Sequence, residues 1–541
     1  MKTGIFIFLL LFIGRNVQAQ TNHFEIIKSM ELLDQIYQHL DMYFVDDPKT
    51  GKLTKIGIDA ILNELDPYTE YYHEANIEDY RLMTTGQYGG IGALIRKMGP
   101  ATFIAEPYEG NPAEKAGLRA GDKIISIDGK SMLNKASDEV SSSLKGPKGT
   151  SIDIEIERNG KKQVIKVTRD EIQLPNVPYS GIIQDQIGYI KLNSFTQTAG
   201  ADVKKALIDL KASGAKSIVL DLRGNGGGLL IEAIKIVNLF VPKGQTVVTT
   251  KGRIKEENRV YQTMEEPIDV QIPLTVLIDG GSASASEIVA GSIQDLDRGV
   301  IVGETSFGKG LVQRTYDLKY GSKVKLTIAK YYTPSGRCVQ RLEYYDKADG
   351  SKPKEIADSL VKKFQTKNGR EVIDGRGIEP DVVVDVKDFS RLTAMVYANN
   401  LIFDFATEYK NAHPTIADAK SFTLSDADYQ AFKEKAIKDT FNYSTASEEI
   451  LKKVMATAEK EGFYEDSKAE FDALMTKVTP SKARDLEKFA PEIKDLIENE
   501  IVSRYYYQKG RAEDSFKSDL VLQKAFEILN DKNKWHTILK K

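Results

Sequence analysis

The spacing of apolar residues changes along this chain, and the changes divide it into regions. Between about residues 23 and 85, apolar side chains such as Ile26, Met30 and Leu33 recur at every third or fourth position, which predicts helices with one apolar face. A second helix is expected after Thr54 and before Asp66-Pro67, a pair that ends helices. This N-terminal helical segment, residues 20–85, is interpreted either as a packing cap or as a dimerisation arm.

From residue 86 the pattern changes to short apolar runs separated by glycine. Residues 103–105 predict a strand, residues 111–118 a short helix that ends at a glycine, and residues 121–129 a turn, a strand and a further turn. Two more strands, at 152–156 and 164–167, are joined through Asn159-Gly160, a pair typical of tight hairpins. Residues 86–172 therefore predict a small domain of their own.

Past residue 173, uninterrupted apolar strands alternate with helical patterns. The strands are expected at 187–190, 217–220, 274–278 and 300–302, and the helices at 199–213, 229–240 and about 284–294. Strands that are apolar throughout are buried on both faces, so residues 173–387 predict an α/β layer with a buried sheet.

The last region, residues 388–541, is helical and charged. Ser425 and the run at 444–449 are typical helix starts, and residues 450–458 and 520–529 each have one apolar face. No motif in this region carries recognisable chemistry.

Length and charge narrow the class of protein. A chain of 541 residues is too long for a single domain. Its formal net charge of −3 gives no electrostatic case for a nucleic-acid partner.

Residues 1–19 predict a cleavable secretory signal peptide. Lys2 supplies the positive start, residues 5–13 an apolar run, and Val17-Gln18-Ala19 a small-residue cleavage site. The run is short for a membrane span, and an uncleaved anchor is the alternative. The protein is therefore expected in the periplasm or outside the cell, with membrane association only if the segment stays uncleaved.

The single cysteine, Cys338, cannot form a disulfide within the chain. It is interpreted as a buried structural thiol rather than a nucleophile, because no histidine lies between His73 and His413.

Candidate chemistry gathers in residues 280–313. Ser282, Ser284 and Ser286 follow a glycine pair at a predicted helix start, and Lys309 stands between two glycines. A serine hydroxyl needs a base to take its proton, and the lack of a nearby histidine favours a lysine over a Ser–His–Asp triad. A lysine base must be neutral, so the site would have to lower its pKa from ~10.4 toward about 7–8.

Plainer interpretations of these residues stay open. Ser284 and Glu287 fit a capping box, so Ser284 could simply cap a helix. A nucleophile could share that position, because the N–H groups at a helix start also favour a developing oxyanion. Lys309 could be an ordinary surface lysine in a glycine loop.

Two glycine motifs are candidate anion sites. Residues 303–309 approach the phosphate-binding pattern G-x-x-x-x-G-K, but Gly310 stands where Ser or Thr is needed, and residues 311–316 predict a strand instead of the required helix. Residues 221–228 end a buried strand with three successive glycines, which favours a nest of backbone N–H groups over a simple tight turn.

Residues 111–129, NPAEKAGLRAGDKIISIDG, resemble a PDZ domain nearly residue for residue. PDZ domains bind a chain terminus as an added strand, with backbone N–H groups receiving the carboxylate. By this resemblance Gly90-Ile91-Gly92 is the carboxylate-binding loop. The simpler alternative is that these glycines only shape a tight turn.

Between about residues 60 and 385 the chain resembles the carboxyl-terminal processing peptidases, or tail-specific proteases. The motifs that carry the resemblance are DLRGNGGGLL at 221–230, GGSASASEIVAG at 280–291, GETSFGKGLVQ at 303–313, YYTPSGRCVQ at 331–340 and GIEPDV at 377–382. The resemblance implies a multidomain α/β fold, with a crotonase-like α/β-superhelix core behind the PDZ domain, and it implies no metal, nucleotide or other cofactor.

The resemblance also assigns roles. It makes Ser284 the nucleophile, Lys309 the general base and Gln313 the residue that orients the lysine. The implied oxyanion donors are the backbone N–H of Ala285 and that of Gly227 or Gly228.

Three positions depart from the family pattern. Gly224 and Gly226 replace residues that are usually asparagine and proline, which loosens the loop and removes no reacting group. Lys145 stands where many members have arginine, so the resemblance does not extend to signalling from the PDZ domain through that position.

The sequence therefore predicts an exported serine endopeptidase that engages protein or peptide substrates with accessible C-termini. The alternative is a PDZ-based binding or adaptor protein on a peptidase-like scaffold that no longer cuts. A homodimer through the terminal helices is a further hypothesis.

Overall fold

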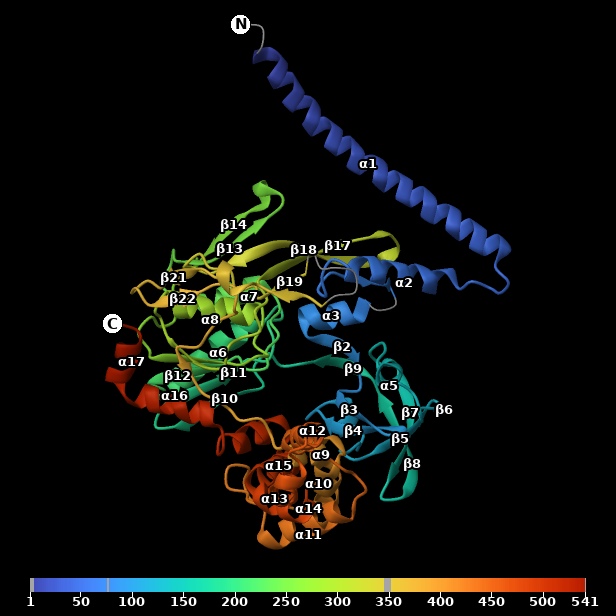
Figure 1. Cartoon of the computed structure of the whole chain (residues 1–541), viewed down its shortest axis with the longest axis vertical. Helices are drawn as coiled ribbons and strands as arrows, with labels where there is room; N and C mark the ends of the chain where they lie inside the picture. The colour runs from blue at the N-terminus through green and yellow to red at the C-terminus, as the bar shows by residue number, and fades with distance from the viewer. Residues whose placement is uncertain (1–3, 75–76, 345–351, 541) are drawn as a thin grey trace. The chain divides into compact units, whose positions relative to one another are not determined.

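The computed structural model describes residues 4–74, 77–344 and 352–540, with side chains described from residue 23 onward (Figure 1). The chain forms two compact units, Met1–Ala75 with Gln313–Thr327, and Asn76–Val312 with Ile328–Lys541. Within the described ranges, no helix combines the length and the apolar character needed to cross a membrane. The predicted signal peptide lies outside the residues whose side chains are described, so it stays a prediction.

The first unit begins with two helices, α1 (Gly4–Tyr43) and α2 (Thr50–Asn63). Helix α2 starts at Thr50, five residues earlier than expected, and ends before Asp66. The Asp66 carboxylate accepts the backbone N–H groups of Tyr68 and Thr69 and so turns the chain. Strand β1 (Glu70–Tyr72) follows and pairs antiparallel with Lys323–Lys325 of strand β18 (Lys323–Tyr332). The sequence pattern did not predict β1.

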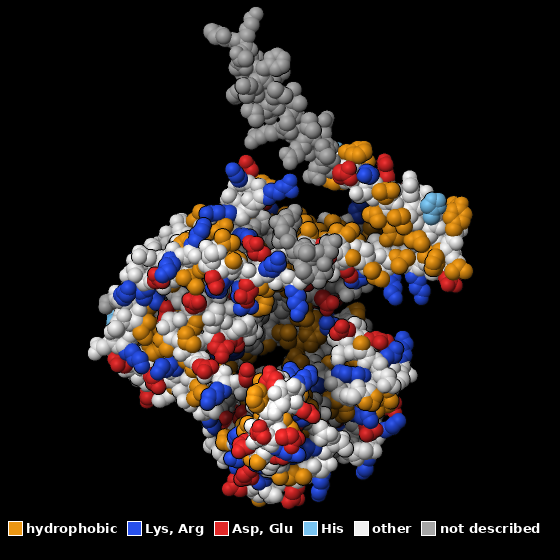
Figure 2. All heavy atoms as spheres, in the orientation of Figure 1, with side chains coloured by type: hydrophobic (Ala, Val, Ile, Leu, Met, Phe, Trp, Pro, Cys, Tyr) orange, Lys and Arg blue, Asp and Glu red, His pale blue; other side chains and the backbone are white. Residues whose placement is uncertain are grey.

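Apolar side chains stay exposed along this first unit. Figure 2 shows hydrophobic side chains gathered over α2 and the described part of α1. The exposed set includes Phe24, Ile26, Ile27, Met30, Leu33 and Ile36 on α1, and Leu53, Ile56 and Ile61 on α2. An apolar surface of this extent is a candidate contact surface.

The PDZ-like region lies in the second unit, after helix α3 (Ile77–Thr85) and strand β2 (Gln87–Gly90). Its sheet has the order β3-β4-β5-β7-β8, with β6 beside β5, and β2 pairs separately with β9. The bounds are β3 Ala93–Met98, β4 Ala101–Pro107, β5 Lys123–Ile127, β6 Lys130–Ser131, β7 Ser151–Arg158, β8 Lys161–Thr168 and β9 Asp170–Gln173, with helices α4 Pro112–Lys115 and α5 Ser137–Leu144.

The predicted hairpin is confirmed in this region. Strands β7 and β8 pair over their full length, and the two residues between them, Asn159 and Gly160, have φ values of 51° and 73°. Positive φ at both central residues is the type I′ geometry that Asn-Gly favours. Helix α5 was not predicted, because its sequence, SDEVSSSL, is mostly polar.

The α/β core contains a six-stranded sheet of order β10-β11-β12-β15-β16-β23. Strand β10 is antiparallel to β11, and the other neighbours are parallel. The predicted strands and helices of the core are confirmed within a few residues. Their bounds are β10 Tyr179–Gln184, β11 Ile187–Lys191, β12 Ser217–Asp221, β15 Leu274–Ile278, β16 Val300–Gly303 and β23 Val382–Val383, with helices α6 Ala199–Ala212, α7 Leu230–Asn238 and α8 Ala285–Asp295.

Both faces of the sheet are buried at its central strands β11, β12, β15 and β16, and different parts of the chain cover them. Ile218 and Leu220 of β12 pack with helices α6, α7 and α8. Val219, between them, faces the other way and packs with α16 (Leu520–Asn530), beside α17 (Lys532–Ile538). Alternate residues of a strand point to opposite faces, so the C-terminal end of the chain supplies the second layer of the core.

Smaller strands complete the core. Strand β13 (Thr246–Gly252) pairs antiparallel with β14 (Arg259–Gln262) and with the end of β18, and β17 (Leu311–Asp317) pairs with β18. Two short antiparallel pairs join β19 (Leu342–Glu343) to β20 (Lys354–Glu355) and β21 (Lys363–Gln365) to β22 (Glu371–Ile373).

The C-terminal region forms its own helical cluster before returning to the core, as Figure 1 shows. The predicted helix starts are confirmed, since Ser425 and Thr445 accept the backbone N–H groups of Asp428 and Glu448. The helices are α9 Arg391–Ala398, α10 Leu401–Ala412, α11 Asp426–Lys438, α12 Ala446–Glu461, α13 Lys468–Val478, α14 Lys482–Lys488 and α15 Ala490–Ser515.

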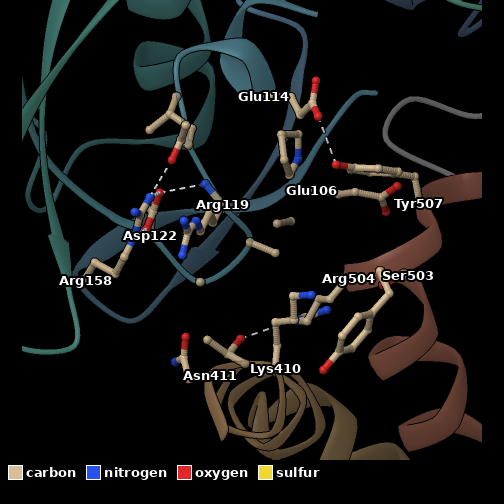
Figure 3. Close-up of a pocket in the computed structure, with 18 of the residues that line it drawn as sticks. Glu106, Glu114, Arg119, Asp122, Arg158, Lys410, Asn411, Ser503, Arg504 and Tyr507 are labelled. Carbon is tan, nitrogen blue, oxygen red and sulfur yellow. Dashed lines mark hydrogen bonds and ion pairs between the residues drawn. The ribbon is translucent and has the colours of Figure 1, made fainter. Parts of the chain in front are cut away.

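Helix α15 meets the PDZ-like region through polar contacts (Figure 3). Gln508 donates to the Glu106 carboxylate at 2.7 Å, and the Tyr507 hydroxyl donates to Glu114 at 3.2 Å. Tyr507 has a φ of 52°, which interrupts the helix at this contact. A cavity of about 480 Å³ lies beside these residues, and burial raises the pKa of the Glu106 carboxyl. The two regions thus meet through hydrogen bonds around a polar cavity.

Candidate active site

Ser284 lies at the N-terminus of helix α8, after strand β15 and a short turn. It is half-buried, and its φ of 55° and ψ of −108° are unusual for a residue with a side chain. Such a conformation costs on the order of 1–3 kcal/mol and persists only where surrounding contacts enforce it. The buried Tyr331 supplies one such contact, because its hydroxyl donates to the Ser284 carbonyl at 3.1 Å.

Glu287, one turn into the helix, connects Ser284 to the lysine loop. Its Oε2 accepts the backbone N–H groups of Ser284 and Lys309, each at 2.8 Å. Its Oε1 accepts the Ser306 hydroxyl at 2.6 Å and the Gly308 N–H at 2.7 Å. Burial raises the pKa of this carboxyl, and the four hydrogen bonds oppose that rise. The capping residue expected from the sequence therefore also holds the second catalytic candidate.

Lys309 is half-buried in the loop between β16 and β17. The glycines beside it are required by close packing. A Cβ at Gly308 would lie 2.6 Å from the Arg341 Cβ, and one at Gly310 would lie 2.8 Å from the backbone N of Gln340. The segment after the lysine is strand β17 and not a helix, which confirms that this motif is not a phosphate-binding loop.

Two other predicted residues lie near these segments in sequence. The Gln313 amide donates to the Thr327 hydroxyl at 3.1 Å, and its role in orienting Lys309 stays a prediction. Cys338 is half-buried, with its sulfur beside Gly310, and burial raises the pKa of its thiol. A raised thiol pKa disfavours the thiolate, in agreement with a structural role.

The glycine loop between β12 and α7 is fixed against Ser284 by Asn225, a residue whose role was not foreseen. The buried Asn225 side chain donates to the Leu192 carbonyl at 2.8 Å and accepts the Gly227 N–H at 2.9 Å. Its own carbonyl accepts the Ala283 N–H at 3.0 Å and the Ser286 hydroxyl at 2.8 Å. One asparagine thus joins the glycine loop to the turn that carries Ser284.

The two candidate oxyanion glycines differ in their hydrogen bonding. A Cβ at Gly227 would lie 2.9 Å from the Ser284 Cβ and 3.0 Å from the Ala285 N, so this backbone packs directly against Ser284. The Gly227 N–H is already donated to Asn225. Among the described residues, no acceptor takes the N–H of Gly228 or of Ala285. This difference favours the Gly228 N–H over the Gly227 N–H as the second oxyanion donor, beside the N–H of Ala285.

The predicted carboxylate-binding loop lies in the PDZ-like region, at the join between β2 and β3. Ile91 is buried, and its carbonyl accepts the Ala113 N–H at 2.7 Å. Gly92 has a φ of 71°, and a Cβ there would lie 2.6 Å from the Asn111 Cβ. Strand β3 is the edge strand of its sheet, a position where an added strand can pair.

Lys145, where the family pattern is altered, contacts the segment before the PDZ-like sheet. Its Nζ lies 3.1 Å from the Asp79 carboxylate of α3 and 5.8 Å from the centre of the Tyr88 ring. Lys145 is therefore ion-paired with Asp79, although the family pattern has arginine at this position.

The structure thus gathers Ser284, Ala285, the glycine loop and the Lys309 loop around the start of α8, through Glu287 and Asn225. Two signals in the sequence pointed toward these connecting residues: a glutamate three positions after a serine, and an asparagine within a glycine run. Their long-range contacts could not be read from those signals.

Family models match three parts of this chain. The model of Peptidase family S41 matches residues 186–344, and a PDZ domain model matches residues 103–158. Residues 392–529 match a family described as probable PDZ-protease, C-terminal helical domain. These matches confirm the predicted multidomain α/β organisation.

Named relatives show the same relationship. A probable CtpA-like serine protease of Staphylococcus aureus (strain bovine RF122 / ET3-1) is 31% identical over 386 residues, covering 71% of this chain and 70% of the relative. A carboxy-terminal-processing protease of Bartonella bacilliformis is 36% identical over 343 residues, covering 62% and 78%. A solved structure named photosystem II D1 C-terminal processing protease is 27% identical and covers 65% of this chain and 87% of that chain, with a TM-score of 0.36. This chain therefore belongs to peptidase family S41, together with the CtpA-like and carboxy-terminal-processing serine proteases.

Proposed function

We propose that this protein is an exported endopeptidase in which Ser284 and Lys309 form the catalytic pair. The observation that carries the proposal is the Glu287 carboxylate, whose single oxygen Oε2 binds the backbone N–H groups of both residues. Two loops that are distant in sequence are thereby held at one point. Neutral Lys309 takes the Ser284 proton as the serine oxygen attacks the scissile carbonyl.

The remaining steps follow acyl transfer. The tetrahedral intermediate collapses, the C–N bond breaks, and the proton on Lys309 passes to the leaving amine. Water then attacks the acyl-enzyme, Lys309 again takes a proton, and the Ser284 oxygen leaves with a proton returned to it. Gln313 is proposed to orient the lysine, as the family motif implies.

The backbone N–H groups of Ala285 and Gly228 are proposed to receive the oxyanion. Both lack an acceptor among the described residues, and Ala285 is the first residue of α8, where the helix dipole favours negative charge. Donors that are fixed in advance cost no reorganisation during the reaction.

The PDZ domain is proposed to capture substrates by their C-termini. The edge strand β3 would pair with the substrate tail, and the loop Gly90-Ile91-Gly92 would receive its carboxylate. Protein and peptide chains with accessible C-termini are therefore the expected partners. The N-terminal sequence supports a location in the periplasm or outside the cell.

The test is cleavage of casein and of an unstructured peptide labelled near its C-terminus. Ser284→Ala should abolish cleavage while thermal unfolding stays within a few degrees of the wild type. The matched control is Ser213→Ala, because Ser213 is an exposed serine that ends helix α6. Retained cleavage by the Ser284 variant would remove that residue from its role.

The same assay tests the alternative of a non-cutting PDZ adaptor. Peptide binding by the wild type without cleavage at any pH from about 6 to 10, a range that spans the deprotonation of a tuned lysine, would support the adaptor.

A further inference from the structure

The glycine loop is connected at its first residues to the far C-terminal end of the chain. The Arg223 guanidinium donates to both oxygens of the Asp519 carboxylate, from Nη1 at 2.9 Å and from Nη2 at 2.6 Å. Such paired hydrogen bonds fix the orientation of both groups. Asp519 is only 14% exposed and also caps helix α16 by accepting the Leu522 N–H at 3.0 Å.

On its other side Arg223 contacts a second carboxylate, that of the buried Asp221. Its Nη2 lies 2.6 Å from Asp221 Oδ2, and its backbone N–H donates to Asp221 Oδ1 at 2.9 Å. Asp221 also accepts the Tyr189 hydroxyl at 2.7 Å and the Lys191 ammonium at 3.2 Å. Burial alone would raise the pKa of Asp221, but Arg223 and Lys191 outweigh it and hold the pKa well below its usual range.

The charges of this cluster balance only when Asp519 is included. Arg223 and Lys191 are two cations, and Asp221 and Asp519 are the carboxylates that face them. Without Asp519, two mostly buried cations would share one carboxylate. Removing one partner from a buried ion pair leaves an uncompensated charge, which the structure relieves by moving or hydrating it.

Arg223 is well placed to transmit such a movement. Its carbonyl accepts the Lys191 ammonium at 2.7 Å, and the next residue, Gly224, donates its N–H to Asp279 at 2.8 Å. Gly227 and Gly228 follow within a few residues. The loop contains three glycines at positive φ, Gly224, Gly227 and Gly228, so its path depends on the contacts that hold it. Asn225 holds its middle, and Arg223 holds its start.

The helix that carries Asp519 is fixed to the core. Val521, Leu522 and Ala525 of α16 are buried against the sheet residues Val219 and Leu277. Strand β12, which contains Val219, leads directly into the glycine loop. Helix α16 therefore holds Asp519 in a constant position relative to the start of that loop.

We propose that Asp519 is a positioning residue for peptide-bond cleavage, acting through Arg223 on the backbone N–H groups that receive the oxyanion. The proposal rests on the proposed role of the glycine loop. It assigns a catalytic contribution to a region whose sequence shows no chemical motif.

The test variant is Asp519→Asn, which removes the charge and keeps a side chain suited to capping a helix. Asp531→Asn is the matched control, because Asp531 caps the next helix through Asn533 and Lys534 and, within the described residues, forms no ion pair. We expect kcat to fall about tenfold to a hundredfold for Asp519→Asn, with KM within about twofold. The control should keep the wild-type values.

A second readout separates positioning from general loss of structure. A peptide boronic acid forms a tetrahedral adduct with the active serine, so its affinity should fall by about the same factor as kcat. Binding of the uncut peptide to Ser284→Ala should not change when Asp519→Asn is added. In a background of Arg223→Gln, Asp519→Asn should cause little further loss, because the two residues act as a unit.

Rates are normalised to the folded fraction, measured by circular dichroism. Asp519→Ser serves as a second variant, because serine can also cap the helix. An unchanged kcat, or a lower kcat with unchanged boronic acid affinity, would overturn the positioning role. The role would also be overturned if the kcat losses of Asp519→Asn and Arg223→Gln added up in the double variant. Failure of the proposed function is distinguishable, since it would show as no cleavage by the wild type or as retained cleavage by Ser284→Ala.

Discussion

At the scale of single residues, the site depends on a buried carboxylate that makes no ion pair within the described residues. Each oxygen of Glu287 accepts two hydrogen bonds, and the four donors come from the helix start and the lysine loop. A carboxylate can accept all four, whereas an amide of the same shape can accept at only one oxygen. Even the substitution of Glu287 by glutamine, which has the same shape, should therefore disturb the site.

Glu287→Gln should therefore impair both stability and activity. Two buried donors would face the amide NH₂, at about 1–3 kcal/mol for each unsatisfied group. We expect a loss of about 2–6 kcal/mol in the free energy of unfolding, measured by urea titration. We also expect kcat to fall at least about a hundredfold, because Ser284 and Lys309 lose their common anchor. Glu266→Gln, at an exposed position, is the control. A wild-type kcat for Glu287→Gln would contradict the anchoring role.

Sequence motifs pointed to the two proposed reacting residues more directly than to the residues that hold them in place. Ser284 and Lys309 lie in recognisable motifs, and the structure brings both to Glu287. Asn225 forms contacts with Leu192 after β11 and with Ala283 and Ser286 at the start of α8, two segments far from it in sequence. Contacts of that kind depend on the completed fold, so no local pattern could predict them.

At the scale of elements, buried strands were predicted most accurately. Strand β15 has the bounds expected from the sequence, because a short apolar run between polar turns has few alternative structures. Strand β1 and helix α5 were missed. The three residues of β1 are stabilised by pairing with β18, and α5 is mostly polar, so neither has a clear local pattern.

Helix α16 offers a direct test of the second layer of the core. Leu522 is fully buried against the sheet, so Leu522→Ala should cost about 2–5 kcal/mol in the free energy of unfolding. Leu520, in the same helix, is 55% exposed, and Leu520→Ala should stay within about 0.5 kcal/mol of the wild type. Urea titration of both variants provides the measurement. Equal effects would show that α16 does not cover the sheet in solution.

The turn between β2 and β3 tests the proposed peptide-binding loop. Gly92→Ala introduces a Cβ 2.6 Å from Asn111 at a φ of 71°, whereas Gly99→Ala introduces one into open space at a φ of 56°. Both changes strain the backbone by about 1–2 kcal/mol, but only the first displaces the loop. In the Ser284→Ala protein, we expect at least tenfold weaker binding of a tail peptide for Gly92→Ala alone, measured by fluorescence anisotropy. Unaltered binding would place the carboxylate site elsewhere.

At the scale of the whole molecule, the sequence predicted the order of the domains, but it did not predict which helices of the C-terminal region pack on the α/β sheet. Its helices were predicted as a separate region, and most of them do form their own core. Helices α16 and α17 instead return to the α/β sheet, where the Trp535 indole donates to the Leu274 carbonyl at 3.2 Å. The apolar face of α16 was visible in the sequence, whereas its partner, about 300 residues earlier, was not.

The N-terminal unit leads to a prediction about assembly. Helix α1 exposes large apolar residues on its described part, with Phe24 63% and Met30 66% exposed. Isolated helices with such surfaces gain stability mainly from packing against a partner, and symmetric dimers are the commonest assembly of soluble chains. We therefore expect the protein without residues 1–19 to be a dimer through this surface, as size-exclusion chromatography with light scattering would show.

Substitutions on α1 can distinguish this contact from a non-specific one. Replacing Ile27, Met30 and Leu33 by lysine should convert the dimer to a monomer, because three charges would enter an apolar interface. Replacing the exposed polar residues Glu31, Gln35 and Gln38 of the same helix by lysine adds as many positive side chains and should have a smaller effect. A monomeric starting protein would reject the dimer, and binding of that monomer to lipid vesicles would assign the surface to a membrane instead.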